Sequence, residues 1–253
     1  MYKILANTIF LGKDVHFLPD CHSTNDIALQ MVRQGSAAEG TIVICDHQIK
    51  GKGQRGNVWL SQAGLNLTFS LILRPTFLDI TEQFSLNMCV SNGIKGLLED
   101  YLTDVKVKWP NDIVVPGYGK IGGVLVENTF SGSNWEYSIV GIGLNINQKS
   151  FLYPKATSMS LITENIFDLK ELFRLLISRI EQSYLKLKRG KLKEIKNEYL
   201  NHLYLRNQKS QFQSDGEIFT GEIKGVTSFG KLQIETEEGE LRLFDLKEVI
   251  FLE

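Results

Sequence analysis

Two cations stand inside a glycine-rich segment in the first third of the chain. The segment GKGQRGNVW runs from Gly51 to Trp59 and holds three glycines together with Lys52 and Arg55. Glycine has no side chain, so backbone amides can approach an anion closely while the cations supply charge. The spacing matches neither the phosphate-binding P-loop nor the dinucleotide fingerprint. By itself the segment fits an anion-binding loop and a solvated surface hairpin about equally well.

A second group of polar residues lies in KWPNDIVV and GKIGGVLVEN, between residues 108 and 128. Asn111 and Asp112 belong to a turn directly before an apolar strand, and Lys120 precedes a Gly-Gly pair in the next strand. A stretch without side chains can admit a ligand, and a lysine beside a dry cleft is a compact cation suited to a phosphate. The alternatives are an exposed hairpin lysine and a turn carboxylate.

A third segment, VGIGLNIN, places Asn145 and Asn147 in a strand with two glycines. A buried asparagine must find hydrogen-bond partners, and the adenine edge, which offers both a donor and an acceptor, is one candidate. A β-bulge whose asparagines bond to the backbone is the other.

The hydrophobic pattern predicts an α+β fold, with a mixed sheet interrupted by hairpins and packed with helices. Period-3.6 patterns predict helices, and short β-branched runs predict strands. The expected helices cover residues 23–35, 84–102, 169–187 and 192–205, and the expected strands cover 41–46, 66–73, 105–109, 112–115, 121–128 and 137–147.

From about Arg206 the pattern changes to short alternating strands with tight turns, which is typical of a small β-barrel. A chain of 253 residues has room for one ordinary domain and a small second one. We therefore expect a catalytic domain over residues 1–205 and an SH3-like barrel over 206–253.

The composition is that of a globular protein, with 43% hydrophobic and 23% charged residues. The net charge of -1 provides no broad field for nucleic acid or an anionic membrane. The three cysteines, Cys21, Cys45 and Cys89, show no metal-binding spacing and suggest no disulfide framework. Without a leader-like segment or an apolar run of about 18 residues, the sequence indicates a cytoplasmic protein.

Taken in order, STN at 23–25, GKGQRGNVW, KWPND, KIGGVLVE and GIGLNIN together resemble the biotin protein ligase family. The resemblance runs from about Phe17 to Asn147 and continues more loosely through the C-terminal strands. It implies an ATP-dependent ligase that forms biotinyl-5'-AMP and then biotinylates a lysine of a carrier protein. It corresponds to the short form of the family, without an N-terminal DNA-binding domain.

The resemblance also implies roles for individual residues. The catalytic lysine falls on Lys120, and Asp112 falls in the region of ATP and Mg²⁺, where it would be a metal ligand. The expected biotin-binding residues are Ser23, Thr24, Asn25, Gln48, Gly51, Lys52, Gly53, Gln54, Lys120 and Gly123. The expected ATP and adenylate contacts are Lys52, Gly53, Gln54, Arg55, Trp59, Asn111, Asp112, Lys120 and Asn145.

The chain departs from the family pattern at three positions. Gln54 and Asn57 stand where the glycine-rich loop usually carries arginines, which removes charge expected near the adenylate phosphate. Gly122 stands where an alanine is common, a change that is sterically mild.

Other classes of protein compete with the ligase interpretation. A lipoate or octanoyl transferase would share the fold and modify a carrier lysine, but its R-R-x-x-G-G-G-x-V-x-H-D signature does not occur. A biotin-binding regulator and an unrelated α+β binding module are further alternatives. The expected partners are biotin, ATP and a biotin carboxyl carrier protein or domain, with no DNA and no membrane, and a homodimer is one option for assembly.

Overall fold

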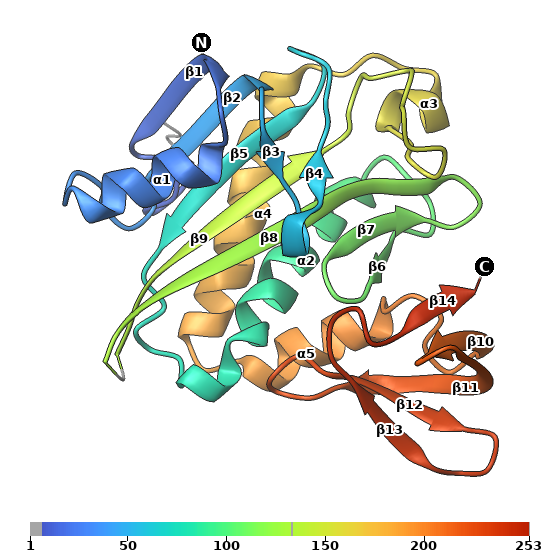
Figure 1. The fold of residues 1–253 in the computed structure, drawn as a ribbon. Helices are drawn as coiled ribbons and strands as arrows, with labels where there is room; N and C mark the ends of the chain where they lie inside the picture. The colour runs from blue at the N-terminus through green and yellow to red at the C-terminus, as the bar shows by residue number, and fades with distance from the viewer. Residues whose placement is uncertain (1–6, 133, 253) are drawn as a thin grey trace.

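A seven-stranded mixed sheet forms the centre of the larger part of the protein (Figure 1). The structure is a computed structural model that describes residues 7–132 and 134–252. The strand order is β1-β2-β5-β9-β8-β7-β6, with β1 parallel to β2 and the other neighbouring pairs antiparallel. The strands are β1 (Val15–Cys21), β2 (Ile42–Gln48), β5 (Leu67–Leu73), β6 (Lys106–Lys108), β7 (Asp112–Val115), β8 (Gly119–Ser131) and β9 (Asn134–Leu144).

Helices cover both faces of this sheet, and the side-chain alternation of β5 shows how. Phe69 and Leu71 belong to the main core, where they pack with residues of helices α2 (Phe84–Leu98) and α4 (Leu169–Lys188). Ile72 faces the opposite side and packs against α1 (Thr24–Arg33). Because successive strand residues alternate between faces, Ser70 also lies on the α1 side, where it contacts that helix.

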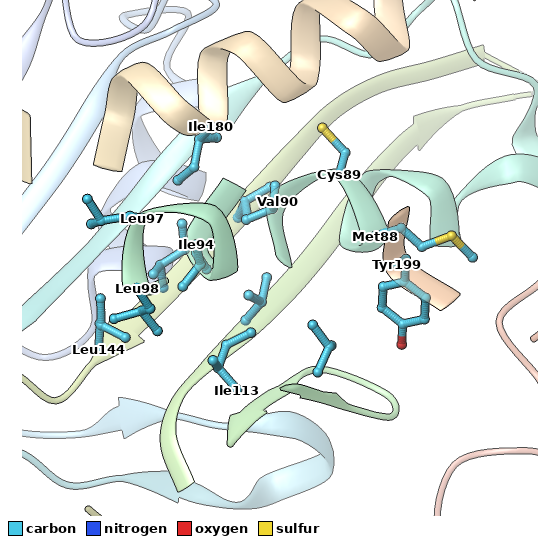
Figure 2. Packing of buried hydrophobic residues seen from close by; sticks show 14 of the residues in the cluster. Met88, Cys89, Val90, Ile94, Leu97, Leu98, Ile113, Leu144, Ile180 and Tyr199 are labelled. Carbon is cyan, nitrogen blue, oxygen red and sulfur yellow. The ribbon is translucent and has the colours of Figure 1, made fainter. Parts of the chain in front are cut away.

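Helix α2 packs beside α4 on one face of the sheet, and its apolar side chains contribute to the core there (Figure 2). Gly93 and Gly96 lower the helix propensity of this segment. Gly93 permits the close packing, since a Cβ there would lie 2.9 Å from the Cα of Ile180. Two shorter helices, α3 (Met159–Thr163) and α5 (Leu192–Asn201), complete this part of the protein. No helix in the described ranges is long and apolar enough to cross a membrane.

The C-terminal strands form a second, five-stranded antiparallel sheet in the order β13-β12-β11-β10-β14. They are β10 (Lys209–Ser214), β11 (Glu217–Val226), β12 (Leu232–Thr236), β13 (Leu241–Phe244) and β14 (Ile250–Leu252). The expected antiparallel strands are confirmed, but the barrel is not closed: over the residues described, β13 and β14 do not pair and each remains an edge. One hydrophobic core runs from α4 and α5 into this sheet through Phe212 and Ile223, so the two parts pack as one body.

Several elements were not predicted. Strand β1 carries Pro19 and polar residues, so its sequence lacks a clean alternation; its place at the edge of the sheet tolerates the proline. Within the glycine-rich segment, β3 (Gly51–Lys52) and β4 (Val58–Trp59) pair as a short hairpin around a 3-10 turn at Gln54–Gly56.

Candidate active site

A cavity of about 300 Å³ opens between α1, the β3–β4 hairpin, strands β7 to β9 and the C-terminal sheet. Glycines on β8 and β9 make part of its lining, and polar side chains surround it. The predicted site residues that line it are Ser23, Thr24, Asn25, Gln48, Lys52, Gly53, Gln54, Trp59, Asn111, Asp112, Lys120 and Gly123. The cavity therefore brings together segments that lie far apart in the sequence.

Lys120 and Asp112 form an ion pair in this cavity, with 2.6 Å between Nζ and Oδ1. The two residues stand on adjacent antiparallel strands, β8 and β7. Gly123 lies beside the pair, and a Cβ there would be 3.4 Å from Asp112 Oδ1 and 3.5 Å from Lys120 Nζ. Both side chains are about 30% exposed (31% and 29%), so the ammonium is held in place yet remains open to a ligand.

The backbone of Lys120 is tied down on both sides by the segment before α3. Its N–H donates to the carbonyl of Lys155 at 2.7 Å, and its carbonyl accepts from the N–H of Thr157 at 2.8 Å. These bonds fix the strand that carries the ammonium, which is the kind of preorganisation that electrostatic catalysis requires.

The indole of Trp59 covers Gly143 of β9. A Cβ at Gly143 would overlap the Trp59 ring, so only glycine allows this packing. Lys120 Nζ lies 5.9 Å from the centre of the indole, a cation–π distance. Among the described residues, Trp59 Nε1 is buried without a hydrogen-bond partner, which leaves a donor for a ligand.

The opposite end of the cavity is polar and uncharged. The backbone N–H of Thr24 donates to Gln48 Oε1 at 2.7 Å, and the Thr24 hydroxyl lies 3.1 Å from the same oxygen. Since Oε1 is occupied, the amide nitrogen of Gln48 is left as a donor. The cavity therefore has a hydrogen-bonding end at α1 and a cationic end at β8.

The glycine-rich hairpin contributes less positive charge than its sequence suggests. Lys52 pairs with Asp26 on α1, and the hydrogen bond to that carboxylate raises the pKa of the lysine. Gln54 and Asn57 line the cavity as neutral side chains. Arg55 has its backbone in the 3-10 turn, but its side chain lies outside the described part of the structure.

Two predicted residues, Gly51 and Asn145, lie outside the lining of the cavity, and a third, Asn111, lines it but turns its amide nitrogen to the backbone. Gly51 packs under the Trp59 carbonyl and does not line the cavity. Asn111 lines it, but its Nδ2 donates to the Val124 carbonyl at 2.5 Å. Asn145 is buried outside the lining, where Nδ2 donates to Thr157 and Oδ1 has no partner among the residues described. The amide of Asn145 thus keeps one unsatisfied acceptor.

The connection from β13 to β14, together with β14, adds a wall that no motif indicated. Leu246, Lys247, Val249 and Phe251 all line the cavity. Lys247 has a φ of 71°, in the left-handed region that is costly for a residue with a Cβ. This wall follows from the packing of the second sheet on the first, for example through the 2.8 Å bond from Trp109 Nε1 to the Gly230 carbonyl.

The described residues include no group of three or more His, Cys, Asp or Glu placed to hold a metal ion. Asp112 is a single carboxylate at the cationic end, with one oxygen paired to Lys120.

Comparison with known proteins defines the class to which this fold and site belong. Residues 18–145 match the model of the biotin/lipoate A/B protein ligase family, and the chain belongs to that family. Residues 211–251 match the biotin protein ligase C terminal domain, so the second sheet is of the type found in biotin ligases.

Individual relatives agree with this assignment. The chain is 28% identical over 243 residues to the bifunctional ligase/repressor BirA of Bacillus subtilis, covering 94% of this chain and 74% of the relative. It is also 28% identical over 142 residues to the biotin–[acetyl-CoA-carboxylase] ligase of Mycobacterium tuberculosis, covering 54% of this chain and 51% of the relative. The structure of the biotin protein ligase from Aquifex aeolicus in complex with biotin and ATP superposes with a TM-score of 0.77 at 28% identity, covering 94% and 98% of the two chains.

Proposed function

We infer that this protein is a biotin protein ligase. It forms biotinyl-5'-AMP from biotin and ATP and then transfers biotin to a specific lysine of a carrier protein, with release of AMP. The observation that carries this inference is the two-ended cavity, in which uncharged hydrogen-bonding groups at Thr24 and Gln48 lie opposite the Lys120 ammonium. The biotin and ATP complex of the Aquifex relative supports the choice of both substrates.

The polar end of the cavity fits biotin better than lipoate. The ureido ring of biotin has two N–H donors and one carbonyl acceptor, whereas the dithiolane ring of lipoate offers no hydrogen-bonding group comparable to them. Burying Thr24 and Gln48 against a ring without partners would leave polar groups unsatisfied, which is costly. The match of the C-terminal sheet to the biotin ligase domain points to the same substrate.

In the first half-reaction a carboxylate oxygen of biotin attacks the α-phosphorus of ATP. The bond between the α-phosphorus and the bridging oxygen breaks, and pyrophosphate leaves. Negative charge in the transition state lies on the phosphoryl oxygens, where the Lys120 ammonium stabilises it. Asp112 holds that ammonium in place at 2.6 Å, so little reorganisation is needed during the reaction.

In the second half-reaction the ε-amine of the acceptor lysine attacks the carbonyl carbon of the mixed anhydride. The bond to the AMP oxygen breaks and an amide forms. The amine must lose a proton, because a free lysine has a pKa of about 10.4. Asp112 is the carboxylate at this end of the cavity, and we assign to it the orientation of the amine or the acceptance of its proton.

We assign ATP contacts to Trp59, Asn111 and Asn145, the last of these to the adenine amino group. The unsatisfied Oδ1 of Asn145 and Nε1 of Trp59 support this assignment, because each needs a ligand partner. Mg²⁺ would enter with the ATP phosphates. Mg²⁺ is often held by one or two carboxylates plus phosphate oxygens, so a single Asp112 fits this donor set. When bound there, the ion would neutralise phosphate charge.

We propose a biotin carboxyl carrier protein or domain as the acceptor, in line with the acetyl-CoA-carboxylase ligase from Mycobacterium tuberculosis. We place the enzyme in the cytoplasm, acting without DNA or a membrane, which its net charge of -1 supports. Residues 1–205 and 206–253 are proposed as its two domains. Pairing of the β1 edge is one route to a homodimer.

Incubation with MgATP, a carrier domain and either biotin, lipoate or octanoate tests the proposed function. Intact mass should show addition of one biotinyl group, dependent on ATP, and pyrophosphate should appear with biotin alone. Pyrophosphate release that depends on lipoate or octanoate instead of biotin would overturn the assignment.

A further inference from the structure

A chain of hydrogen bonds runs behind the polar end of the cavity and ends on a carboxylate. Asn25 Nδ2 donates to Glu127 Oε2 at 2.7 Å, and Ser70 Oγ donates to Asn25 Oδ1 at 2.5 Å. The hydroxyl oxygens of Ser70 and Thr24 lie 2.7 Å apart, and the Thr24 amide donates to Gln48 Oε1 at 2.7 Å. Glu127 stands on β8, beyond the residues that line the cavity.

The Glu127 carboxylate determines the direction of every hydrogen bond in this series. An ionised carboxylate only accepts hydrogen bonds, so Asn25 must turn its NH₂ group toward Glu127 and its carbonyl toward Ser70. The single hydrogen of the Ser70 hydroxyl is then used on Asn25. Two oxygens 2.7 Å apart need a hydrogen between them, so the Thr24 hydroxyl gives its one hydrogen to Ser70 and not to Gln48 Oε1, which lies farther away at 3.1 Å and already accepts from the Thr24 amide. The Thr24 oxygen then keeps a lone pair for a ligand.

Packing prevents these hydrogen bonds from reversing their direction. Asn25 is 3% exposed and Ser70 is fully buried, so bulk water has little access to either partner. A Cβ at Gly141 would overlap Asn25 Oδ1, so β9 presses directly on the amide. Rotating that amide by half a turn would place its carbonyl against the Glu127 carboxylate, which is repulsive.

We propose that Glu127 is a positioning residue for biotin specificity, acting through Asn25 and Ser70 on the hydroxyl of Thr24. In this arrangement Thr24 presents an acceptor to a ureido N–H, while Gln48 presents its Nε2 donor to the ureido carbonyl. The proposal rests on the proposed function and deepens it. It accounts for a carboxylate that is half-buried on the sheet yet lies outside the cavity.

The Glu127→Gln variant tests this role. Glutamine can turn either its oxygen or its nitrogen toward Asn25, so the direction of the chain is no longer set. We expect the Kd for biotin to rise about tenfold, the scale of one lost charge-assisted hydrogen bond. The KM for ATP and the kcat at saturating biotin should stay within about threefold of wild type. Glu136→Gln, the same change at an exposed position on β9, is the matched control and should change nothing.

A second pair of variants separates direction from simple structural support. Asn25→Asp alone places a second carboxylate against that of Glu127. The repulsion should weaken biotin binding by about a hundredfold. Combined with Glu127→Gln, the new aspartate can accept from the side-chain amide that the second substitution introduces and still accept from Ser70. The double variant should therefore bind biotin at least about tenfold more tightly than Asn25→Asp alone.

Isothermal titration of biotin, with thermal melting of each variant, provides the measurements. Absence of biotin binding by the wild type would refute the proposed function itself. Wild-type binding together with an unchanged Kd in Glu127→Gln would refute only the positioning role. A double variant as weak as Asn25→Asp, with an unchanged melting temperature, would do the same.

Discussion

Replacing Lys120 with alanine separates catalysis from stability at the centre of the site. The variant removes an ammonium that lies 2.6 Å from Asp112 in a pair that is about 30% exposed (31% and 29%). Ion pairs with this degree of solvent contact contribute about 0 to 1 kcal/mol to folding. For a chain of this size, such a loss lowers Tm by at most about 2 to 4 °C. Loss of one preorganised charge stabiliser, by contrast, slows a reaction by about two to three powers of ten, or about 2.7 to 4 kcal/mol.

The assay follows biotin-dependent pyrophosphate release and biotin affinity in the same preparation. Adenylate formation should fall by about 10² to 10³, while the Kd for biotin changes much less, since Thr24 and Gln48 remain. Near-normal turnover in Lys120→Ala would refute the reasoning and reduce Lys120 to a surface lysine of a hairpin.

Three further predictions concern two other residues of the cavity and one histidine outside its lining. Lys247→Gly removes a cation that lines the cavity, so adenylate formation should fall about tenfold. The same change relieves a φ of 71°, so Tm should stay the same or rise. The control is Asp215→Gly, which relieves a φ of 50° in an exposed turn and should leave activity intact. Gln54→Arg places a charged donor over the cavity and should slow dissociation of labelled biotinyl adenylate up to about tenfold; equal off-rates would show that Gln54 does not face the phosphate. Burial and the neighbouring ammonium of Lys95 lower the pKa of His202, so the unfolded chain takes up the proton first and stability should fall as pH drops below about 6.5. The free energy of unfolding is measured by denaturant titration at about pH 7.5 and about pH 5.5, on either side of the ordinary histidine pKa. Its decrease between the two pH values should be smaller in His202→Asn than in the wild type.

The amino-acid sequence alone determined the local elements and picked out Lys120 and Asp112, the two residues of the cationic end. Helices α1, α2, α4 and α5 and most strands follow from hydrophobic periodicity, and their ends differ from expectation by a few residues. Lys120 and Asp112 were each singled out from their local motifs, whereas their ion pair across β7 and β8 came from the structure. The family resemblance rested on such local motifs, and the family match confirms it.

Tertiary structure decided everything that depends on contacts between distant segments. The expected barrel is an open sheet, because strand pairing beyond a hairpin depends on what the strands pack against and not on their alternation. The wall at Lys247 and the bond between Asn25 and Glu127 join residues that are far apart in the chain. No local pattern encodes such contacts, because the sequence around each of these residues is that of an ordinary surface or strand position. The contact forms only when the sheets and helices pack the two side chains together.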